Sequence, residues 1–291
     1  MPRIAVLLTT LIWGATFPAT KAALEQIPPL TFLFLRFALG AVMAIALARL
    51  AGLRLTATPA VVRMSVIASV WLCLGYICQT VGLRYTSASN SAFITVLYVV
   101  FVPLFLWRLG LGTMVATVLA LVGLWLLVKP SSASMNVGDL LTLLCAAAFA
   151  AHIVCLERFT KAGESTSIFL GQLFITTAVM AVMMLWEQPP ASAFTPSTSA
   201  LVGLFVTGVL ATGAFAVQMW AQRVVPAQQV ALIFALEPAL AAWLAWLFLG
   251  EVLDMQGWIG SGCIFVATMI GALASTEAAS APPERERSVA A

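Results

Sequence analysis

The sequence alternates between long apolar segments and short polar links that often contain proline. A helix needs about 20 apolar residues to cross the hydrocarbon core of a bilayer. Ten segments approach that length, and we predict membrane-spanning helices over residues 4–22, 29–50, 63–83, 89–108, 111–128, 138–157, 166–186, 200–221, 227–249 and 256–275. These spans leave no room for a soluble domain. The pattern therefore predicts an all-α polytopic membrane protein with ten transmembrane helices.

The composition supports a location in the bilayer. Hydrophobic residues make up 62% of the chain and charged residues 9%, whereas charged residues make up about 25% of an ordinary soluble protein. The lipid bilayer is therefore an expected partner. Nucleic acid is not, because no basic patch is interleaved with aromatic residues. The five cysteines lie in apolar runs and the chain has one histidine, so we predict neither a metal site nor another cofactor.

Lysine and arginine residues are distributed unevenly between the two sides of the predicted spans. If the N-terminus is cytoplasmic, the inner side holds Arg3, Arg49, Arg54, Arg63, Arg108, Arg158, Lys161, Arg223, Arg285 and Arg287. The outer side holds Lys21, Arg84 and Lys129. Because cytoplasmic loops are enriched in basic residues, we predict a bacterial inner (plasma) membrane protein with both termini cytoplasmic. Residues 276–291 are polar, which predicts a disordered cytoplasmic tail.

The sequence contains an internal repeat. A shift of 139 positions places Gly75, Tyr76, Gln79, Arg84, Ala88, Ala92 and Leu97 on Ala214, Phe215, Gln218, Arg223, Ala227, Ala231 and Leu236. Residues 7–17 align with residues 143–153 at a shift of 136, and the tetrapeptide AVMA at 41–44 recurs at 178–181. We predict two five-helix repeats, 1–130 and 131–275. Because five is odd, the second repeat should enter the membrane from the opposite side, and such folds bind substrate near the midplane.

Polar and aromatic residues inside the third and fourth spans are candidates for a binding site. Tyr76 and Gln79 are spaced i and i+3, so they share one helix face, and the repeat gives them the partners Phe215 and Gln218. Residues Asn90, Ile94 and Tyr98 form a stripe at i, i+4 and i+8. Buried polar groups in lipid need partners, which water or substrate in a cavity would supply. Packing of these side chains in a protein core is the alternative.

Trp13 and His152 lie in mid-span in the two halves of the sequence. Trp13 precedes Gly14 and Pro18, and a proline cannot bond the carbonyl four residues before it, so we expect the first helix to bend there. The indole then forms a gate, a stacking platform or simply core packing. His152 either donates a hydrogen bond to substrate or is a satisfied core residue.

Arg36 and Glu237 are the clear charged residues within the predicted spans. Each is expensive in hydrocarbon, at about 2.5 to 3.5 kcal/mol on insertion scales. Glu237 precedes Pro238 and is a candidate to receive a substrate ammonium group or a coupling proton. A structural ion pair between Arg36 and Glu237 is the alternative.

Several motifs carry a family resemblance. They are WGATFP at 13–18, the Leu35–Arg36 pair in the second span, the paired fourth and ninth helices, and LEPALAAWLAWLFLGE at 236–251. In order and spacing they resemble the EamA-type branch of the drug/metabolite transporter superfamily over residues 4–275, and within it the YddG-like aromatic amino acid exporters. The resemblance implies ten helices in two inverted repeats around a central cavity, and export of metabolites such as amino acids.

We therefore expect a secondary transporter that exports aromatic or other hydrophobic amino acids by alternating access. The expected substrate-binding residues are Trp13, Tyr76, Gln79, Asn90, Ile94, Tyr98, His152, Phe215, Gln218 and Glu237. With only Glu237 and His152 as titratable groups, we favour a facilitated carrier, and a proton-coupled exporter of drugs or other metabolites is the alternative. No carboxylate lies between Ile4 and Ala19 for a small-multidrug-type antiporter, and no catalytic constellation indicates an enzyme. A monomer is compatible with the sequence.

Overall fold

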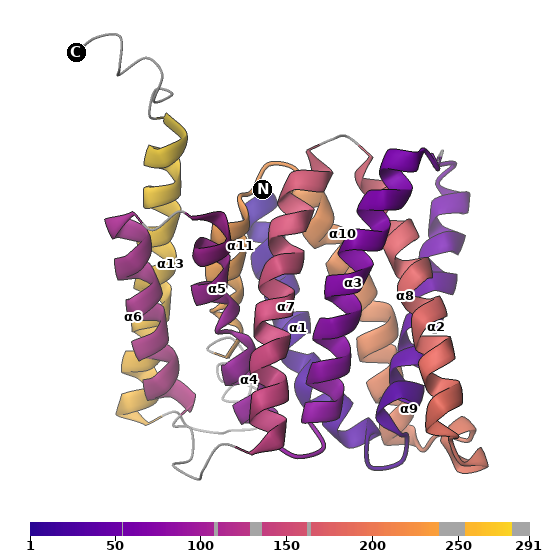
Figure 1. Ribbon diagram of the computed structural model, residues 1–291. Coiled ribbons are helices and arrows are strands. Elements are labelled where there is room, and N and C mark those ends of the chain that lie inside the picture. Colours follow the sequence, from indigo (N-terminus) through magenta and orange to yellow (C-terminus); the bar gives the residue numbers. More distant parts are fainter. Residues whose placement is uncertain (54, 108–109, 129–135, 162–163, 239–253, 281–291) are drawn as a thin grey trace.

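The computed structural model describes residues 1–291 except 54, 108–109, 129–135, 162–163, 239–253 and 281–291, and in the described residues it is helical (Figure 1). The first half contains α1 (Pro2–Ala23), α2 (Pro29–Leu50), α3 (Pro59–Gly82), α4 (Ala88–Thr95), α5 (Tyr98–Leu106) and α6 (Leu111–Val128). The second half contains α7 (Val137–Thr160), α8 (Ser165–Glu187), the 3₁₀ turn η1 (Ala191–Phe194), α9 (Thr198–Leu204), the π-helical turn η2 (Phe205–Leu210), α10 (Ala211–Ala221), α11 (Ala227–Phe234) and α13 (Met255–Ser280).

The ends of the helices have local causes in the sequence. α1, α2 and α3 each begin with a proline at the first helical position, where the missing N–H has no intrahelical partner to lose. α7 begins with a capping box, in which the Asn136 side chain accepts from the Asp139 N–H at 3.0 Å and the Asp139 carboxylate accepts from the Asn136 N–H at 3.1 Å. These caps fix the residues at which the helices begin and the preceding links end.

The helices have the length and surface of membrane spans. Six are long and apolar enough to cross a bilayer: Pro2–Ala23, Pro29–Leu50, Pro59–Gly82, Val137–Thr160, Ser165–Glu187 and Thr198–Ala221. Three shorter apolar helices cover Asn90–Leu106, Leu111–Leu126 and Met255–Gly271. Large apolar side chains such as Val118, Val182 and Phe174 point outward, as expected of a surface in contact with lipid. Of the predicted span 227–249, the part from 239 onward lies outside the described residues.

Two predicted spans are interrupted at matching positions. α4 ends at Thr95 and α5 begins at Tyr98, so a turn at 96–97 interrupts the predicted span 89–108. In the second half α11 ends at Phe234 and a turn follows. Both interruptions use the same backbone bonds, since the N–H of residue 97 bonds to carbonyl 94 and that of residue 236 bonds to carbonyl 233. The two turns are 139 positions apart, which is the shift of the sequence repeat.

Equivalent helices of the two halves make corresponding contacts. α6 packs along α13, and α2 packs along α8 (Figure 1). α3 packs against α7, and correspondingly α10 packs against α1. α1 and α7 run in opposite directions, and the α3–α4 turn (83–87) and the α10–α11 turn (222–226) lie at opposite ends of the bundle. The N-terminus and the end of α13 lie at the same end as the α10–α11 turn.

Candidate functional site

A cavity lies in the middle of the bundle between α1, α3, α7 and α10 and beside both interruptions. Its walls are formed by Trp13, Thr16, Phe17, Leu72, Tyr76, Gln79, Thr95, Tyr98, Phe149, His152, Ile153, Phe215, Gln218, Phe234 and Glu237. Eight of the ten residues that the sequence predicts are among them. The volume is about 70 Å³, which is room for a few water molecules and too little for an aromatic amino acid.

Asn90 and Ile94 do not line the cavity, so the structure does not bring them to the other candidates. Asn90 lies in the first turn of α4, where its N–H bonds to the Ser87 side chain at 3.0 Å. At 1.5 Å of rise per residue it is about 7 Å along the helix from Thr95, which does line the cavity. The prediction failed because it assumed that one unbroken helix carries Asn90, Ile94 and Tyr98 on one face.

The lining residues are related by the shifts of the sequence repeat. The shift is 136 positions from α1 to α7 and 139 positions from the α3–α5 region to the α10–α11 region. With these shifts, fourteen of the fifteen lining residues form seven pairs. The pairs are Trp13 with Phe149, Thr16 with His152, Phe17 with Ile153, Tyr76 with Phe215, Gln79 with Gln218, Thr95 with Phe234 and Tyr98 with Glu237. Leu72 is the remaining residue. The two halves of the chain therefore contribute equivalent positions to one cavity.

Three polar groups of the cavity have no hydrogen-bond partner. In the part of the chain that the structure describes, five buried side-chain N or O atoms are unpartnered, and three of these belong to lining residues. They are the indole Nε1 of Trp13, the hydroxyl of Tyr98 and Oε1 of Glu237. Leaving a buried polar group unpaired costs about 1 to 3 kcal/mol. A ligand that accepts from the indole and donates to the carboxylate would remove that cost.

Other polar groups at the cavity are bonded to the protein. Gln79 Nε2 donates to the Thr95 hydroxyl at 3.3 Å, and Gln218 Nε2 donates to Oε1 of Gln222 at 3.0 Å. His152 Nε2 lies 3.1 Å from Oε1 of Gln172, which accepts from the imidazole N–H. His152 is thus held by a neighbouring helix through Nε2, and in a neutral imidazole Nδ1 is then the acceptor.

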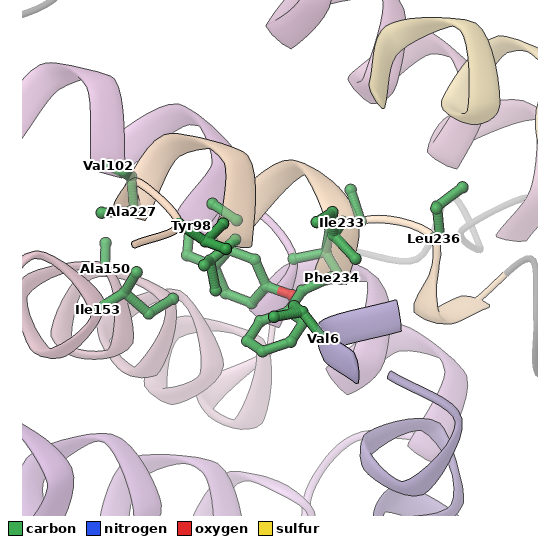
Figure 2. Close-up of a cluster of buried hydrophobic side chains, with 14 of the residues drawn as sticks. Val6, Tyr98, Val102, Ala150, Ile153, Ala227, Ile233, Phe234 and Leu236 are labelled. Carbon is green, nitrogen blue, oxygen red and sulfur yellow. The ribbon is translucent and has the colours of Figure 1, made fainter. Parts of the chain in front are cut away.

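Aromatic side chains form most of the remaining wall. Tyr76 and Phe149 meet edge to face, with ring centroids 5.1 Å apart. Tyr98 and Phe234 meet at 6.4 Å and 76°, and Figure 2 shows them within a buried apolar cluster that also includes Val6. This cluster shares Tyr98, Ile153 and Phe234 with the cavity wall. The cavity is therefore a largely apolar, aromatic site with few polar groups, which is typical of small-molecule sites.

The expected alternative of a structural Arg36–Glu237 bridge is not found. The structure shows one ion pair among the residues that it describes, between Lys161 and Glu157 at 2.8 Å. Oε1 of Glu237 and Nε of Arg36 are both buried without a hydrogen-bond partner. Glu237 instead faces the cavity.

Polar contacts hold the hairpin turn at each end of the bundle. At the end opposite to the N-terminus, Lys21 Nζ donates to the carbonyls of Leu83 and Thr86 in the α3–α4 turn. The Thr86 hydroxyl in turn donates to Asp139 at 2.6 Å. We call the contacts of Lys21 the lower latch.

An equivalent contact lies at the N-terminal end. There Oε2 of Glu157 accepts from the N–H of Ala227, the first residue of α11, at 2.8 Å. We call this contact the upper latch. Glu157 lies 136 positions after Lys21, so the two latches occupy equivalent places in the repeat. Each latch ties a hairpin turn to a helix whose residues line the cavity.

Comparison with known proteins identifies the family. The sequence profile of the EamA-like transporter family matches residues 2–129 and residues 136–272. The chain belongs to the EamA-like transporter family. It is therefore a multi-pass membrane protein of a family of small-molecule transporters.

Relatives of this EamA-like chain are also described as transporters. An uncharacterized transporter of Archaeoglobus fulgidus is 30% identical over 283 residues, which covers 93% of this chain and 85% of that protein. The uncharacterized transporter YoaV of Bacillus subtilis is 23% identical over 89% of this chain and 92% of its own. A solved crystal structure superposes with a TM-score of 0.76 at 17% identity, covering 95% of this chain and 98% of that one. At that identity the likeness concerns the fold.

Of the seven cavity residues that sequence reasoning did not select, two are repeat partners of selected ones and four pair with each other. Phe149 is the partner of Trp13, Thr16 of His152, and Phe17 of Ile153, while Thr95 pairs with Phe234. Applying the two shifts to every candidate would have found Phe149 and Thr16. Leu72 has no such signal, because a leucine in an apolar helix is indistinguishable from packing.

Proposed function

We propose that this EamA-like protein is a secondary transporter that exports small metabolites, namely aromatic or other hydrophobic amino acids, as the YddG-like exporters do. The observation that carries the proposal is the central cavity, in which aromatic rings surround an unpartnered N–H of Trp13, an unpartnered hydroxyl of Tyr98 and an unpartnered Oε1 of Glu237. The rings suit an apolar side chain. The Trp13 N–H can donate to a carboxylate group, and Oε1 of Glu237 can accept from an ammonium group.

The proposed architecture is ten transmembrane helices in two inverted five-helix repeats. Three observations support it: the family profile matches the chain twice, the cavity residues pair across the repeat, and α1 and α7 run in opposite directions (Figure 1). In this arrangement both termini are cytoplasmic, since most of the basic residues outside the spans fall on that side. The N-terminal end of the bundle is then the cytoplasmic face, and the lower latch faces outward.

The proposed mechanism is rocking of the two halves around the cavity. A substrate cannot reach the cavity while both latches are formed, and a volume of about 70 Å³ does not hold an aromatic amino acid. Release of the upper latch would admit substrate from the cytoplasm, and release of the lower latch would discharge it. The interruptions at 96–97 and 235–236 would give α4 and α11 freedom to move relative to the residues that follow them.

The proposed energy source is the substrate gradient itself. A proton-coupled carrier needs a titratable group that meets substrate and proton in turn, and Glu237 is the carboxyl group that faces the cavity in the described residues. His152 is already bonded to Gln172, and among the described lining residues no second carboxyl group stands beside Glu237 to pass on a proton. Proton coupling through Glu237 alone is the competing mechanism.

The test is uptake of labelled phenylalanine, tyrosine and tryptophan by proteoliposomes that contain the purified protein. Saturable uptake that is unchanged by an imposed pH gradient is the expected result. Uptake that depends on the gradient would replace the facilitated carrier with a proton-coupled one and keep the substrate. Absence of uptake, with cationic dyes or sugar phosphates transported instead, would refute the proposed substrate. Empty liposomes are the control.

A further inference from the structure

Arg36 is a buried charge that neither the fold nor the proposed site has yet explained. It lies in the middle of α2 with 4% of its surface exposed. Its Nε has no hydrogen-bond partner, and no ion pair joins it to a described residue. A guanidinium group that is buried without a counter-ion is strongly unfavourable. A chain that retains it at this depth should gain something from the charge.

Two aromatic rings contact the guanidinium group of Arg36. Its Cζ lies 4.5 Å from the ring centroid of Tyr76 and 5.2 Å from that of Phe37. Cation–π contacts at these distances stabilise a desolvated cation in part. They leave Nε without an acceptor, and the N–H groups of a guanidinium are directional donors suited to a carboxylate.

The ring of Tyr76 separates Arg36 from the cavity. Tyr76 is a lining residue, and its ring meets Phe37 on one side and Phe149 on the other, each edge to face at 5.1 Å. Arg36 does not line the cavity, but it contacts the ring of a residue that does. A change in the Tyr76 side-chain torsion would open a direct path between the guanidinium group and the cavity.

The repeat shows that packing alone does not require an arginine here. The tetrapeptides at 41–44 and 178–181 relate α2 to α8 by 137 positions, which places Arg36 on Leu173. Leu173 is buried in the same apolar cluster as Tyr76 and Phe37. An apolar residue thus fills the equivalent place in the other half, and Glu237 likewise has the neutral partner Tyr98. One unpaired cation and one unpaired carboxylate break the symmetry of the site.

We propose that Arg36 binds the carboxylate of the substrate, while Glu237 receives its ammonium group, so that the transported species is a zwitterionic amino acid. This inference rests on the proposed function and adds a residue and a substrate class to it. When the cavity expands for substrate, the Tyr76 ring turns aside and stacks on the substrate side chain. The guanidinium group then meets the carboxylate in the bidentate geometry that arginine favours.

The first test uses the unaltered protein and a series of competitors against uptake of labelled phenylalanine. Phenethylamine lacks the carboxylate, and phenylalanine methyl ester masks it. We expect both to compete about 10- to 100-fold more weakly than phenylalanine, the range of a charge-assisted hydrogen bond. Equal competition by phenethylamine would overturn the role of Arg36 and leave the proposed function intact. Absence of phenylalanine uptake would overturn the proposed function, and with it this inference.

The second test uses variants. Arg36→Met should reduce the preference for phenylalanine over phenethylamine to within about 3-fold, whereas Arg36→Lys keeps the charge and should restore part of it. A purely structural role would weaken both compounds equally. Leu173→Met is the matched control at the equivalent buried position and should keep the preference. An Arg36→Met protein that elutes as a folded species and still discriminates would overturn the proposal. If that variant does not fold, the competition series on the unaltered protein decides.

Discussion

Removal of the lower latch should open the cavity toward one face only. In Lys21→Met the side chain keeps its apolar stem and loses the ammonium group that donates to the carbonyls of Leu83 and Thr86. A hydrogen bond to a charged group contributes about 1.5 to 3 kcal/mol. Because Lys21 is partly exposed, we take about 2 kcal/mol for the two bonds together. That value corresponds to about a 30-fold rise in the ratio of open to closed latch.

The opening can be measured by labelling a cysteine in the cavity. Thr16→Cys, in a protein whose five native cysteines are replaced, places a thiol on the cavity wall. A membrane-impermeant thiol reagent is then added to one face of sealed vesicles at a time. We expect the labelling rate from the outer face to rise by about 30-fold in Lys21→Met and the rate from the inner face to stay unchanged. Glu157→Met, at the upper latch, should give the reverse asymmetry.

Two controls decide whether the latch is responsible. Arg84→Met removes a positive charge from an exposed position of the same turn and should leave both rates unchanged. An equal rise at both faces in Lys21→Met would mean general loosening. No rise at either face in a protein that remains folded would show that these hydrogen bonds do not close the cavity. Either result refutes the reasoning.

Three further predictions concern single side chains. Glu237→Gln should lower phenylalanine uptake at least 10-fold with an unchanged melting temperature, and unchanged uptake would assign the carboxylate a structural role. Tyr98→Phe removes a hydroxyl that has no protein partner, so the melting temperature should hold while the apparent Kd for substrate rises about 3- to 10-fold; an unchanged Kd would place the hydroxyl outside the binding interaction. In Gly138→Ala the added carbon would lie 2.5 Å from the carbonyl oxygen of Gly82, so we expect a loss of about 1 to 3 kcal/mol of stability in thermal unfolding. Gly213→Ala, which meets nothing within 4 Å, is its control, and equal melting temperatures for the two would contradict the packing argument.

The sequence repeat made most of the site predictable. Tyr76, Gln79, Phe215 and Gln218 were selected as two pairs of equivalent positions, and all four line the cavity. A single aromatic or amide in an apolar helix is ambiguous, because core packing explains it equally well. Two of them at the same place in two halves of a chain indicate a shared surface, since packing environments rarely coincide unless the halves meet there.

The interruptions of the helices were predictable in one half only. Pro238 removes the N–H that would bond to the Phe234 carbonyl, so a break near 235 has a local cause. In the first half, the residue equivalent to Pro238 is Val99, whose N–H bonds to the carbonyl of Val96. Nothing in residues 96–97 departs from helical preference. The first break follows from the fold of the repeat as a whole.

The latches were invisible in the sequence for a different reason. Lys21 and Glu157 are charged residues near helix ends. Lys21 contributes only to the predicted orientation of the chain, and no sequence pattern singles out Glu157. Their partners are backbone groups of Leu83, Thr86 and Ala227. Every residue carries such groups, so no side-chain pattern marks which carbonyl or N–H a distant charge will reach.

The pairing of cavity residues bears on the order of states in the transport cycle. When both hairpin turns are latched, the two halves have the least reason to differ in conformation, so the closed state is the point of highest symmetry. Opening toward either face then breaks that symmetry in one of two opposite senses, and each open state is approximately the image of the other with the halves exchanged. Positions shared by the copies cannot favour one sense. The resting orientation must be set by the pairs in which the copies differ, among them the pairs that differ in charge: Lys21 with Glu157, Tyr98 with Glu237 and Arg36 with Leu173.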